Sequence, residues 1–392
     1  MASSPTSYES TAELLSKEFE RAHHIRPAIF RAPGRVNLIG EHTDYNDGFV
    51  MPAAIGFYTW IAASSRPDRI LHVRSGEFHE TIDLSLDSLN GAPRKHWSDF
   101  VRGVAAVLRS SGISLSGANL IIQGQVPMGA GLSSSASLEV AIGLALLATS
   151  REQIPQLDLV KICQRAEHEY VGTRCGIMDQ FIAVFASSGH ALMIDCRSLE
   201  SQSLLIPDDA RLVICNSMVK HELASGEYNR RRAECEAGVR IFQKYLPRVS
   251  ALRDVTLADL EAHKPELTEV VYRRCRHVVT ENQRVLDAAE ALRGSNLARF
   301  GQLMYESHRS LQHDYEVSST ELDLLVEIAS SCEGVYGSRM TGGGFGGCTI
   351  TLVSSHSVEA FRDNITRKYR EKTGIRPDLY VCSAAQGAGE WK

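Results

Sequence analysis

The sequence predicts an α+β fold in two lobes. Its expected helices and strands mix along the chain without strict alternation, which favours α+β over a doubly wound parallel sheet. The chain has 392 residues, 43% of them hydrophobic. That is more than one core normally needs, so the length favours two domains or one two-lobed body. We place the boundary within 204–209, which gives lobes of residues 1–205 and 206–392.

Hydrophobic periodicity places the elements of the first half. An amphipathic helix is expected over 8–24, because Leu14, Leu15 and Phe19 share one face. A strand over 28–32 leads into a polar, glycine-containing loop over 33–48. Runs rich in β-branched and aromatic residues predict strands. The further elements expected are strands over 57–63, 70–73, 120–126 and 191–195, helices over 135–147 and 157–171, and a short helical or buried segment over 180–186.

The second half is expected to be mainly helical. A strand over 212–215 opens it, and three long charged segments follow. The expected helices cover 230–245, 268–292 and 296–312, before a glycine-rich turn at 342–347 and a strand over 348–353.

Composition excludes several classes of protein. The formal charge of −5 comes without a sustained basic face, which argues against nucleic acid as a partner. The longest apolar run, 140–148, is less than half of a membrane span, and the first 25 residues lack a signal-peptide core. Nine cysteines without a Cys-x-x-Cys pair are expected to be buried thiols. We therefore expect a cytoplasmic protein and, because no interface is evident in the sequence, a monomer.

Residues 126–139 (VPMGAGLSSSASLE) carry the most informative pattern. Gly129 and Gly131 allow a tight turn and a close approach of the backbone to a ligand. Ser133, Ser134 and Ser135 follow where a helix begins, and the first turn of a helix attracts anions. The pattern predicts a phosphate cradle different from the common P-loop, because the Gly-Lys-Ser/Thr ending is missing. The alternative is a glycine turn with a serine N-cap.

Residues 31–45 (RAPGRVNLIGEHTDY) concentrate Arg35, Glu41, His42 and Asp44 in a loop. This mixture of donors and acceptors suits a polyhydroxylated ligand, because each hydroxyl both gives and takes a hydrogen bond. The alternative is a solvated loop with internal salt bridges.

Residues 338–348 (SRMTGGGFGGC) contain a nominal Gly-x-Gly-x-x-Gly. As a dinucleotide fingerprint it is weak, because a strand follows it rather than a helix. A tight turn between two strands, brought against a ligand or against the first glycine loop, fits better.

Two carboxylates attract attention by their surroundings. Glu167 shares a helix face with apolar residues, which is costly unless the carboxylate is paired or holds a metal. Mg²⁺ near phosphates, with Ser135 as a second ligand, would account for it. The alternative is a salt bridge to Arg165 or another basic residue. Asp179 lies at an apparent helix start, where it serves either as an N-cap or as a base for a sugar hydroxyl.

The three glycine-bearing stretches, in this order, resemble the motifs of the small-molecule kinase superfamily that contains galactokinases, homoserine kinases, mevalonate kinases and phosphomevalonate kinases. Residues 34–45 (GRVNLIGEHTDY) resemble the signature of the galactokinase branch. The resemblance spans nearly the whole chain, including 175–181, 195–200, 227–232 and 340–349. It implies a two-lobed small-molecule kinase fold with mixed or antiparallel sheets and the active site between the lobes.

The resemblance also implies roles for individual residues. Asp179 matches the catalytic carboxylate that takes the proton of the anomeric hydroxyl, and Arg35 matches the arginine beside it. Glu41, His42, Asp44, Tyr228 and Gly176 match sugar-binding positions. Gly129, Gly131, Ser133 and Ser134 match the phosphate loop for ATP, with Ser75 and Trp97 as weaker matches to the nucleotide pocket. Ser135 and Glu167 match the Mg²⁺ ligands.

The activity implied is ATP-dependent phosphorylation of α-D-galactose at its anomeric hydroxyl. One alternative is a kinase for a related sugar, such as N-acetylgalactosamine or L-arabinose. Another is an inactive galactose sensor, but sensors of the yeast type lack the serine–alanine pair that this chain keeps at Ser135 and Ala136. A degenerate nucleotide-binding protein is disfavoured, because the full set of acidic residues is present.

Overall fold

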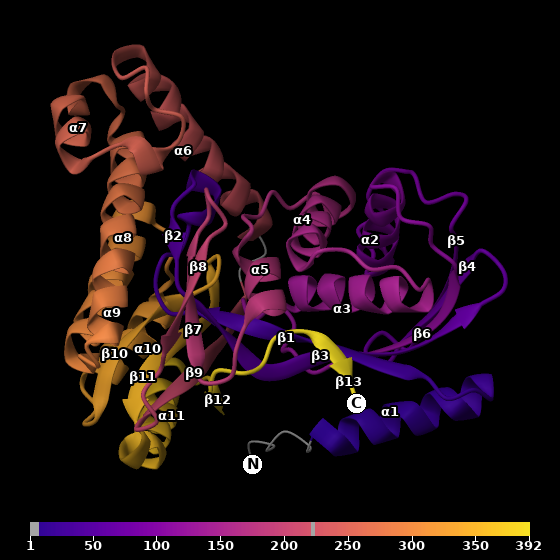
Figure 1. The fold of residues 1–392 in the computed structure, drawn as a ribbon. Coiled ribbons are helices and arrows are strands. Elements are labelled where there is room, and N and C mark those ends of the chain that lie inside the picture. Colours follow the sequence, from indigo (N-terminus) through magenta and orange to yellow (C-terminus); the bar gives the residue numbers. More distant parts are fainter. Residues whose placement is uncertain (1–7, 221–223) are drawn as a thin grey trace.

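The computed structural model describes residues 8–220 and 224–392 (Figure 1). In the first half the helices are α1 (Tyr8–His23), α2 (Ser98–Ser110), α3 (Ser134–Thr149), α4 (Gln156–Ala166) and α5 (Met178–Phe185). The strands there are β1 (Ala28–Asn37), β2 (Phe49–Val50), β3 (Pro52–Arg66), β4 (Ile70–Ser75), β5 (Glu80–Ser85), β6 (Gly117–Gly124), β7 (His190–Asp195) and β8 (Ser201–Leu205).

In the second half the helices are α6 (Ala224–Tyr245), α7 (Leu257–Ala262), α8 (Glu269–Arg293), α9 (Leu297–Ser310), α10 (Thr320–Ser330) and α11 (Val358–Thr373). The strands are β9 (Ala210–Lys220), β10 (Val335–Thr341), β11 (Gly346–Ser354), β12 (Asp378–Cys382) and β13 (Gly389–Trp391).

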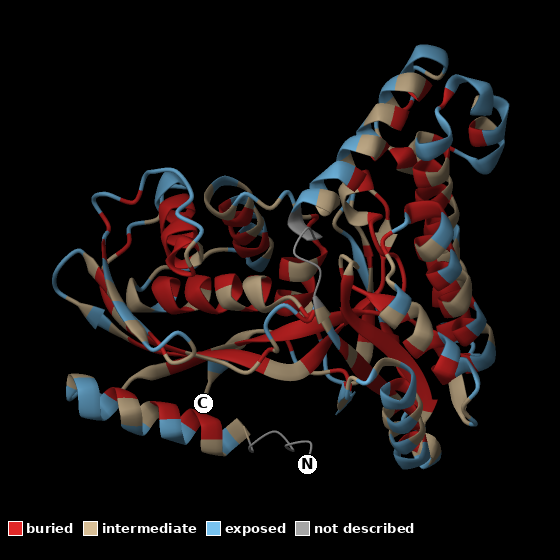
Figure 2. Cartoon of the chain, turned by 180° about the vertical axis from the view of Figure 1, so that it is seen from behind, coloured by how far each residue is buried: buried red, intermediate tan, exposed pale blue. Residues whose placement is uncertain are grey.

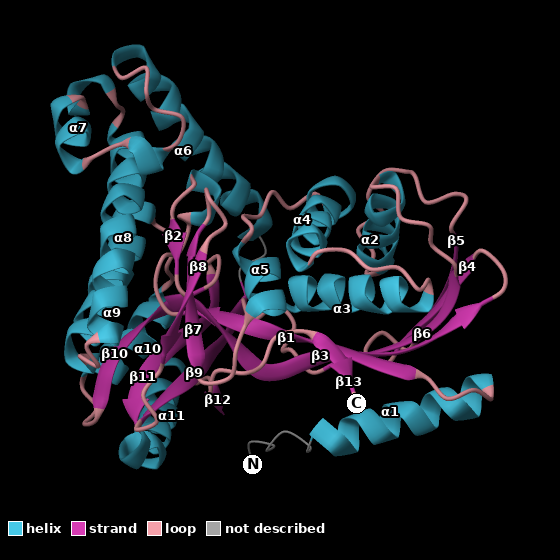
Figure 3. Cartoon of the chain, in the orientation of Figure 1, coloured by secondary structure: helices cyan, strands magenta, loops and turns pink. Residues whose placement is uncertain are grey.

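A six-stranded sheet organises the N-terminal lobe, in the order β13-β1-β3-β6-β4-β5. Its pairs are antiparallel except for the parallel pair β4–β6. Helices α2 to α5 cover one face and α1 lies on the other (Figure 3). Most of the core lies between the sheet and α2–α5, and a smaller cluster that includes Phe19 and Trp60 lies under α1. The α+β prediction is confirmed.

The C-terminal lobe is built on an antiparallel sheet in the order β10-β11-β9-β12, and β2, β7 and β8 form a third sheet. Buried residues concentrate in the sheets and on the helix faces that pack against them, whereas α7 is largely exposed (Figure 2). One hydrophobic cluster joins residues of both halves, from Val36 to Ala384, and β13 returns to pair with β1. The boundary at 205/206 therefore crosses a shared core and stays a prediction.

Two of the differences from the sequence prediction bear on the site. The loop expected over 33–48 begins as strand, because β1 continues to Asn37 and pairs Arg35 with Ala54 after a register shift at Pro33. The helix expected over 157–171 is α helical only to Ala166. Residues Glu167–Val171 form one wider π-helical turn, a distortion often found at functional sites. Among the described residues, none of the helices combines the length and the apolar character that a membrane span needs.

Candidate active site

An ion pair between Arg35 on β1 and Asp179 on α5 lies at the centre of the candidate site. Arg35 Nε donates to Asp179 Oδ1 at 2.8 Å, and Nη2 donates to Oδ2 at 2.9 Å. The third nitrogen, Nη1, donates to the carbonyl of Gly131 at 2.6 Å. The N-cap alternative for Asp179 is wrong, since Ile177 occupies that position and Asp179 lies within the first turn. The pair therefore ties the first turn of α5 to the glycine–serine loop.

The glycine–serine loop enters α3 as predicted, with Ser134 as the first helical residue. Ser133 has a left-handed backbone (φ +57°) and makes no cap bond. Its hydroxyl donates instead to the Asp179 carboxylate. Ser133 therefore occupies the N-cap position of α3 but does not cap the helix with its side chain, and a non-glycine residue held at positive φ is often found at functional sites. Through Ser133 and Arg35, the positive end of α3 and the carboxylate of Asp179 share one small space.

The third glycine motif packs against this loop, which confirms its prediction as a turn between two strands. Strands β10 and β11 are antiparallel neighbours joined by it. Gly342 has φ +84°, and a Cβ there would lie 2.8 Å from the carbonyl oxygen of Gly131. Gly347 likewise faces the carbonyl oxygen of Ala130, at 3.2 Å from its would-be Cβ. Glycines let the two loops approach this closely.

The predicted sugar residues converge beside Asp179. Asp44 packs on Gly176 so closely that a Cβ there would lie 1.7 Å from Asp44 Oδ2. The rings of His42 and Tyr228 lie 5.5 Å apart, which brings α6 to the loop after β1. Glu41 is 2% exposed. The solvated-loop alternative is wrong, because Glu41 and His42 are buried.

Burial sets the charge states of this group. It raises the pKa of Asp44 to about 7, with the negative charge of Asp179 as the second cause. It lowers the pKa of His42 to about 3, so this imidazole is neutral. His42 Nδ1 lies 2.8 Å from the Tyr45 hydroxyl, and the Gly343 backbone interacts with the same ring, while the buried Nε2 makes no hydrogen bond of ordinary geometry. A neutral ring and polar groups of this kind leave unused hydrogen-bonding capacity for hydroxyl groups.

Glu167 lies in a second acidic group. The Ser135 hydroxyl bonds it, and Gln180 Nε2 donates to both Glu167 at 2.8 Å and Glu139 at 3.0 Å. Burial first, and then the charge of Asp179, raise the pKa of Glu167 to about 7, and burial also raises that of Glu139. The salt-bridge alternative with Arg165 is wrong, because Arg165 pairs with Glu169 at 2.7 Å.

These residues fit Mg²⁺. Two buried carboxylates lie together, and Glu139 Oε1 has no hydrogen-bond partner. Oxygen ligands of this kind suit a hard divalent cation. In the described part of the chain, no three His, Cys, Asp or Glu side chains form a metal cage. This fits Mg²⁺, which is usually held by one or two carboxylates together with waters and substrate phosphates. Sequence reasoning missed Glu139, although a glutamate one helical turn after Ser135 in an apolar helix was an available signal.

A cavity next to the start of α3 is lined by Ser75, Trp97, Ser134 and Ser135. Phe78 stacks on Trp97 with ring centres 5.8 Å apart and planes 4° apart. The two weaker nucleotide-pocket matches therefore lie in one cavity with two serines of the glycine–serine loop.

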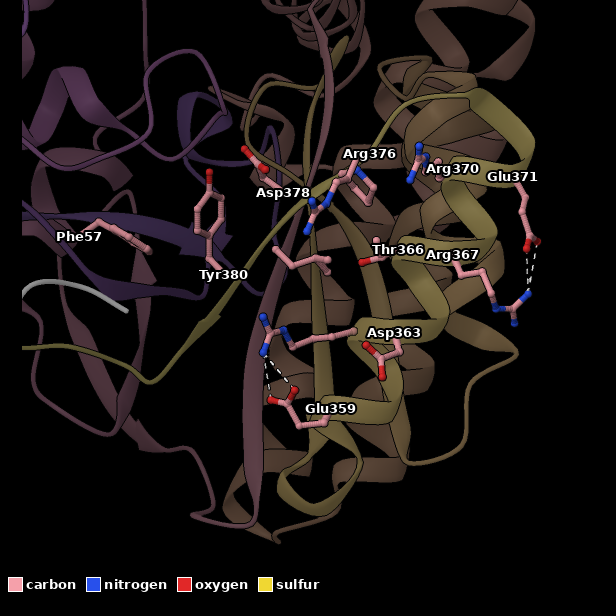
Figure 4. Close-up of a pocket in the computed structure, with 13 residues that line it drawn as sticks. Phe57, Glu359, Asp363, Thr366, Arg367, Arg370, Glu371, Arg376, Asp378 and Tyr380 are labelled. Carbon is pink, nitrogen blue, oxygen red and sulfur yellow. Dashed lines mark hydrogen bonds and ion pairs between the residues drawn. The ribbon is translucent and has the colours of Figure 1, made fainter. Parts of the chain in front are cut away.

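A separate groove lies between α11 and β12 (Figure 4). Its four arginines face four acidic residues, with Arg362 paired to Glu359 and Arg367 to Glu371. The formal charges of these residues balance, and no predicted site residue lines the groove.

Three family models match: the galactokinase galactose-binding signature over residues 17–65, the GHMP kinases N terminal domain over 99–187 and the GHMP kinases C terminal model over 288–371. The chain is 48% identical over 376 residues to a galactokinase of Roseiflexus sp. (strain RS-1), covering 96% of each chain. It is 47% identical to one of Chloroflexus aggregans, covering 94% of this chain and 95% of that one. The chain belongs to the galactokinase family.

Solved structures agree with this family assignment. The Lactococcus lactis galactokinase, solved with galactose, superimposes with a TM-score of 0.94 at 36% identity, over 97% of this chain and all of that one. A mevalonate kinase of Methanococcus jannaschii has a TM-score of 0.64 at 18% identity, over 92% of this chain and 99% of that one, and shares the fold. Family membership makes ATP the expected phosphoryl donor.

Proposed function

We propose that this chain transfers the γ-phosphoryl group of ATP to the anomeric hydroxyl of α-D-galactose, giving galactose 1-phosphate and ADP. One observation carries the proposal: the Arg35–Asp179 pair bridges the glycine–serine loop and the buried group of Glu41, His42 and Asp44. A donor phosphate held by the loop and a sugar held by that group would meet at this pair.

On the sugar side, Asp179 orients the anomeric hydroxyl and accepts its proton. Arg35 fixes the carboxylate through two parallel bonds and places a positive charge beside the transferring group. Glu41, His42, Asp44 and Tyr228 hold the other hydroxyls and the ring. Only glycine fits at position 176, because Asp44 occupies the space that a side chain there would need.

On the nucleotide side, Gly129, Gly131, Ser133 and Ser134 hold the phosphates, and Ser75 and Trp97 line the pocket for the base. Ser135 and Glu167 would hold Mg²⁺, which when bound neutralises charge on the phosphates. Phosphoryl transfer needs little covalent chemistry from the protein, so positioning and charge stabilisation account for most of the rate. The described residues provide both.

The test is product formation by the purified chain with ATP, Mg²⁺ and galactose, followed by ³¹P NMR of the sugar phosphate. A 1-phosphate doublet coupled to the anomeric proton is expected. A phosphate at another carbon would contradict the role of Asp179, and turnover only with N-acetylgalactosamine or L-arabinose would contradict the sugar.

We also propose that the protein is a cytoplasmic monomer. All nine cysteines are free thiols, which suits a reducing compartment. Six are buried as predicted, whereas Cys175, Cys196 and Cys332 are only half-buried. Light scattering at the enzyme's working concentration should give the 43.1 kDa of one chain, and a dimer mass would contradict the proposal.

A further inference from the structure

Strand β10 of the C-terminal lobe contacts the end of β1 through two side chains on one face. Arg339 and Thr341 are two positions apart, so they point the same way. Arg339 Nη1 donates to the carbonyl of Asn37 at 3.1 Å. Thr341 Oγ1 accepts from the amide of Asn37 at 2.9 Å. The loop that carries the sugar signature begins directly after Asn37, so β10 holds the last residue before this loop through both its amide and its carbonyl.

Arg339 is buried without enough partners for its charge. Its exposed fraction is 0%, and its Nε and Nη2 atoms have no hydrogen-bond partner. Nη1 lies 3.6 Å from Glu41 Oε1, and Glu281 on α8 supplies the next negative charge. An apolar residue would fill such a position at lower cost, because burying an incompletely paired charge is unfavourable. The presence of an arginine here is explained if its positive charge acts on the nearby carboxylate of Glu41.

The carboxylate of Glu41 is held from the same side. The amide of Gly342, three residues after Arg339, donates to Glu41 Oε1 at 2.7 Å. The loop around Glu41 is fixed from behind by α8, where Glu281 Oε1 accepts the amide of Gly40 at 2.9 Å. The Gly342 amide and the Arg339 guanidinium both lie against Oε1, which orients the carboxylate. Burial raises the pKa of Glu41, and the charge of Arg339 is the largest effect that opposes this rise.

We propose that Arg339 is a positioning residue for sugar recognition: it keeps the buried Glu41 ionised and aims it at one hydroxyl of galactose. Arg339 touches neither sugar nor phosphate in this role. The inference rests on the proposed function, because it needs Glu41 to bind the sugar. It adds a specificity determinant from the third glycine motif, at the opposite end of the chain from the sugar signature.

The experiment compares wild type, Arg339→Lys, Arg339→Met and Glu41→Gln with galactose and with its 2-, 3-, 4- and 6-deoxy derivatives. In wild type, loss of the hydroxyl that meets Glu41 should lower kcat/KM on the order of 10- to 100-fold. Glu41→Gln should abolish most of that penalty and so identify the hydroxyl. Arg339→Met should reduce the same penalty to about threefold or less, with the galactose KM raised about tenfold and the ATP KM within about twofold. Arg339→Lys, which keeps the charge but not the guanidinium group, should reduce the penalty only in part.

Arg102→Lys is the matched control. Arg102 is 1% exposed, bonds Asp99 at 2.7 Å, and also has two unpartnered nitrogens, but it lies on α2 of the other lobe. Its variant should keep every deoxygalactose penalty. If Arg339→Met does not fold, Arg339→Lys, which keeps the buried charge, carries the comparison.

Two results would overturn the inference while leaving the proposed function intact. One is a folded Arg339 variant that phosphorylates galactose with all penalties unchanged. The other is a Glu41→Gln variant that alters no penalty, which removes the residue through which Arg339 acts. Absence of galactose phosphorylation in wild type would instead refute the proposed function itself.

Discussion

Replacement of Asp179 by asparagine tests the centre of the site. Asparagine keeps the shape of the side chain but cannot accept a proton from a sugar hydroxyl at neutral pH. A positioned general base contributes on the order of 10²–10⁴ in rate, so kcat should fall by that factor, or about 3–5 kcal/mol in activation free energy. The ATP KM should stay within about threefold, because Ser75 and Trp97 line a cavity that Asp179 does not line.

The same change also breaks a bidentate ion pair. Removing one partner of a buried pair costs about 3–5 kcal/mol. Asp179 is 22% exposed and asparagine still accepts one bond from Arg35, so we expect the loss of stability to be about 2–3 kcal/mol. Asp195→Asn is a matched control, because Asp195 is also 22% exposed and pairs with both terminal nitrogens of Arg253. It should lose similar stability but keep kcat.

The assay is ADP release at saturating galactose and ATP, with thermal melting of both variants. A low kcat in Asp179→Asn alone supports the base role. A kcat within about tenfold of wild type would refute that role. An equal fall of kcat in both variants would mean that lost stability, and not a lost base, causes the effect.

Three further predictions concern the sugar loop and the metal ligands. Gly176→Ala should raise the galactose KM at least about tenfold and leave the ATP KM unchanged, because the new Cβ would displace Asp44. Steady-state kinetics with each substrate varied measure both constants, and an unchanged galactose KM would contradict the prediction. The raised pKa of Asp44, about 7 against an ordinary 3.8, makes the folded state bind its proton more tightly than the unfolded chain. Stability should therefore fall as pH rises from about 4 to 7, and Asp44→Asn should melt higher than wild type at pH 8 but not at pH 4; parallel melting curves would argue against this. Glu167→Gln should raise the Mg²⁺ concentration needed for half-maximal activity. It should also weaken the Mg²⁺-dependent binding of a non-hydrolysable ATP analogue, measured by calorimetry. Equal Mg²⁺ titrations of variant and wild type would show that Glu167 is not a metal ligand.

The sequence allowed the fold class and most elements to be predicted because their patterns are local. The helix of α1 follows from the spacing of Leu15 and Phe19, which are both buried. The prediction that Leu14 shares this face is wrong, because Leu14 is 59% exposed. The extension of β1 to Asn37 was not predictable, because it depends on pairing with β3 across a register shift at a proline. The π-helical turn at Glu167 has no pattern of its own in sequence either.

In the candidate site, too, some residues are predictable from the local sequence and others are not. Residues in contiguous motifs, such as Glu41 and Ser133, could be singled out by composition and by resemblance. Glu139 was missed although its place in an apolar helix was a signal. Gln180 and Arg339 lie within quoted stretches, but their roles depend on burial without full pairing, which the sequence does not show. Tertiary contact, not local pattern, brings Gln180 between two carboxylates.

The central claim is phosphorylation of galactose, and the most direct measurement is ADP release with ATP and Mg²⁺ across galactose, glucose, N-acetylgalactosamine, L-arabinose and mevalonate. The account predicts galactose as clearly the best substrate, with kcat on the order of 1–100 s⁻¹. A preference for another member of the panel would contradict the sugar assignment. Binding of galactose and ATP without turnover would contradict the catalytic role of Arg35 and Asp179 and indicate a sensor.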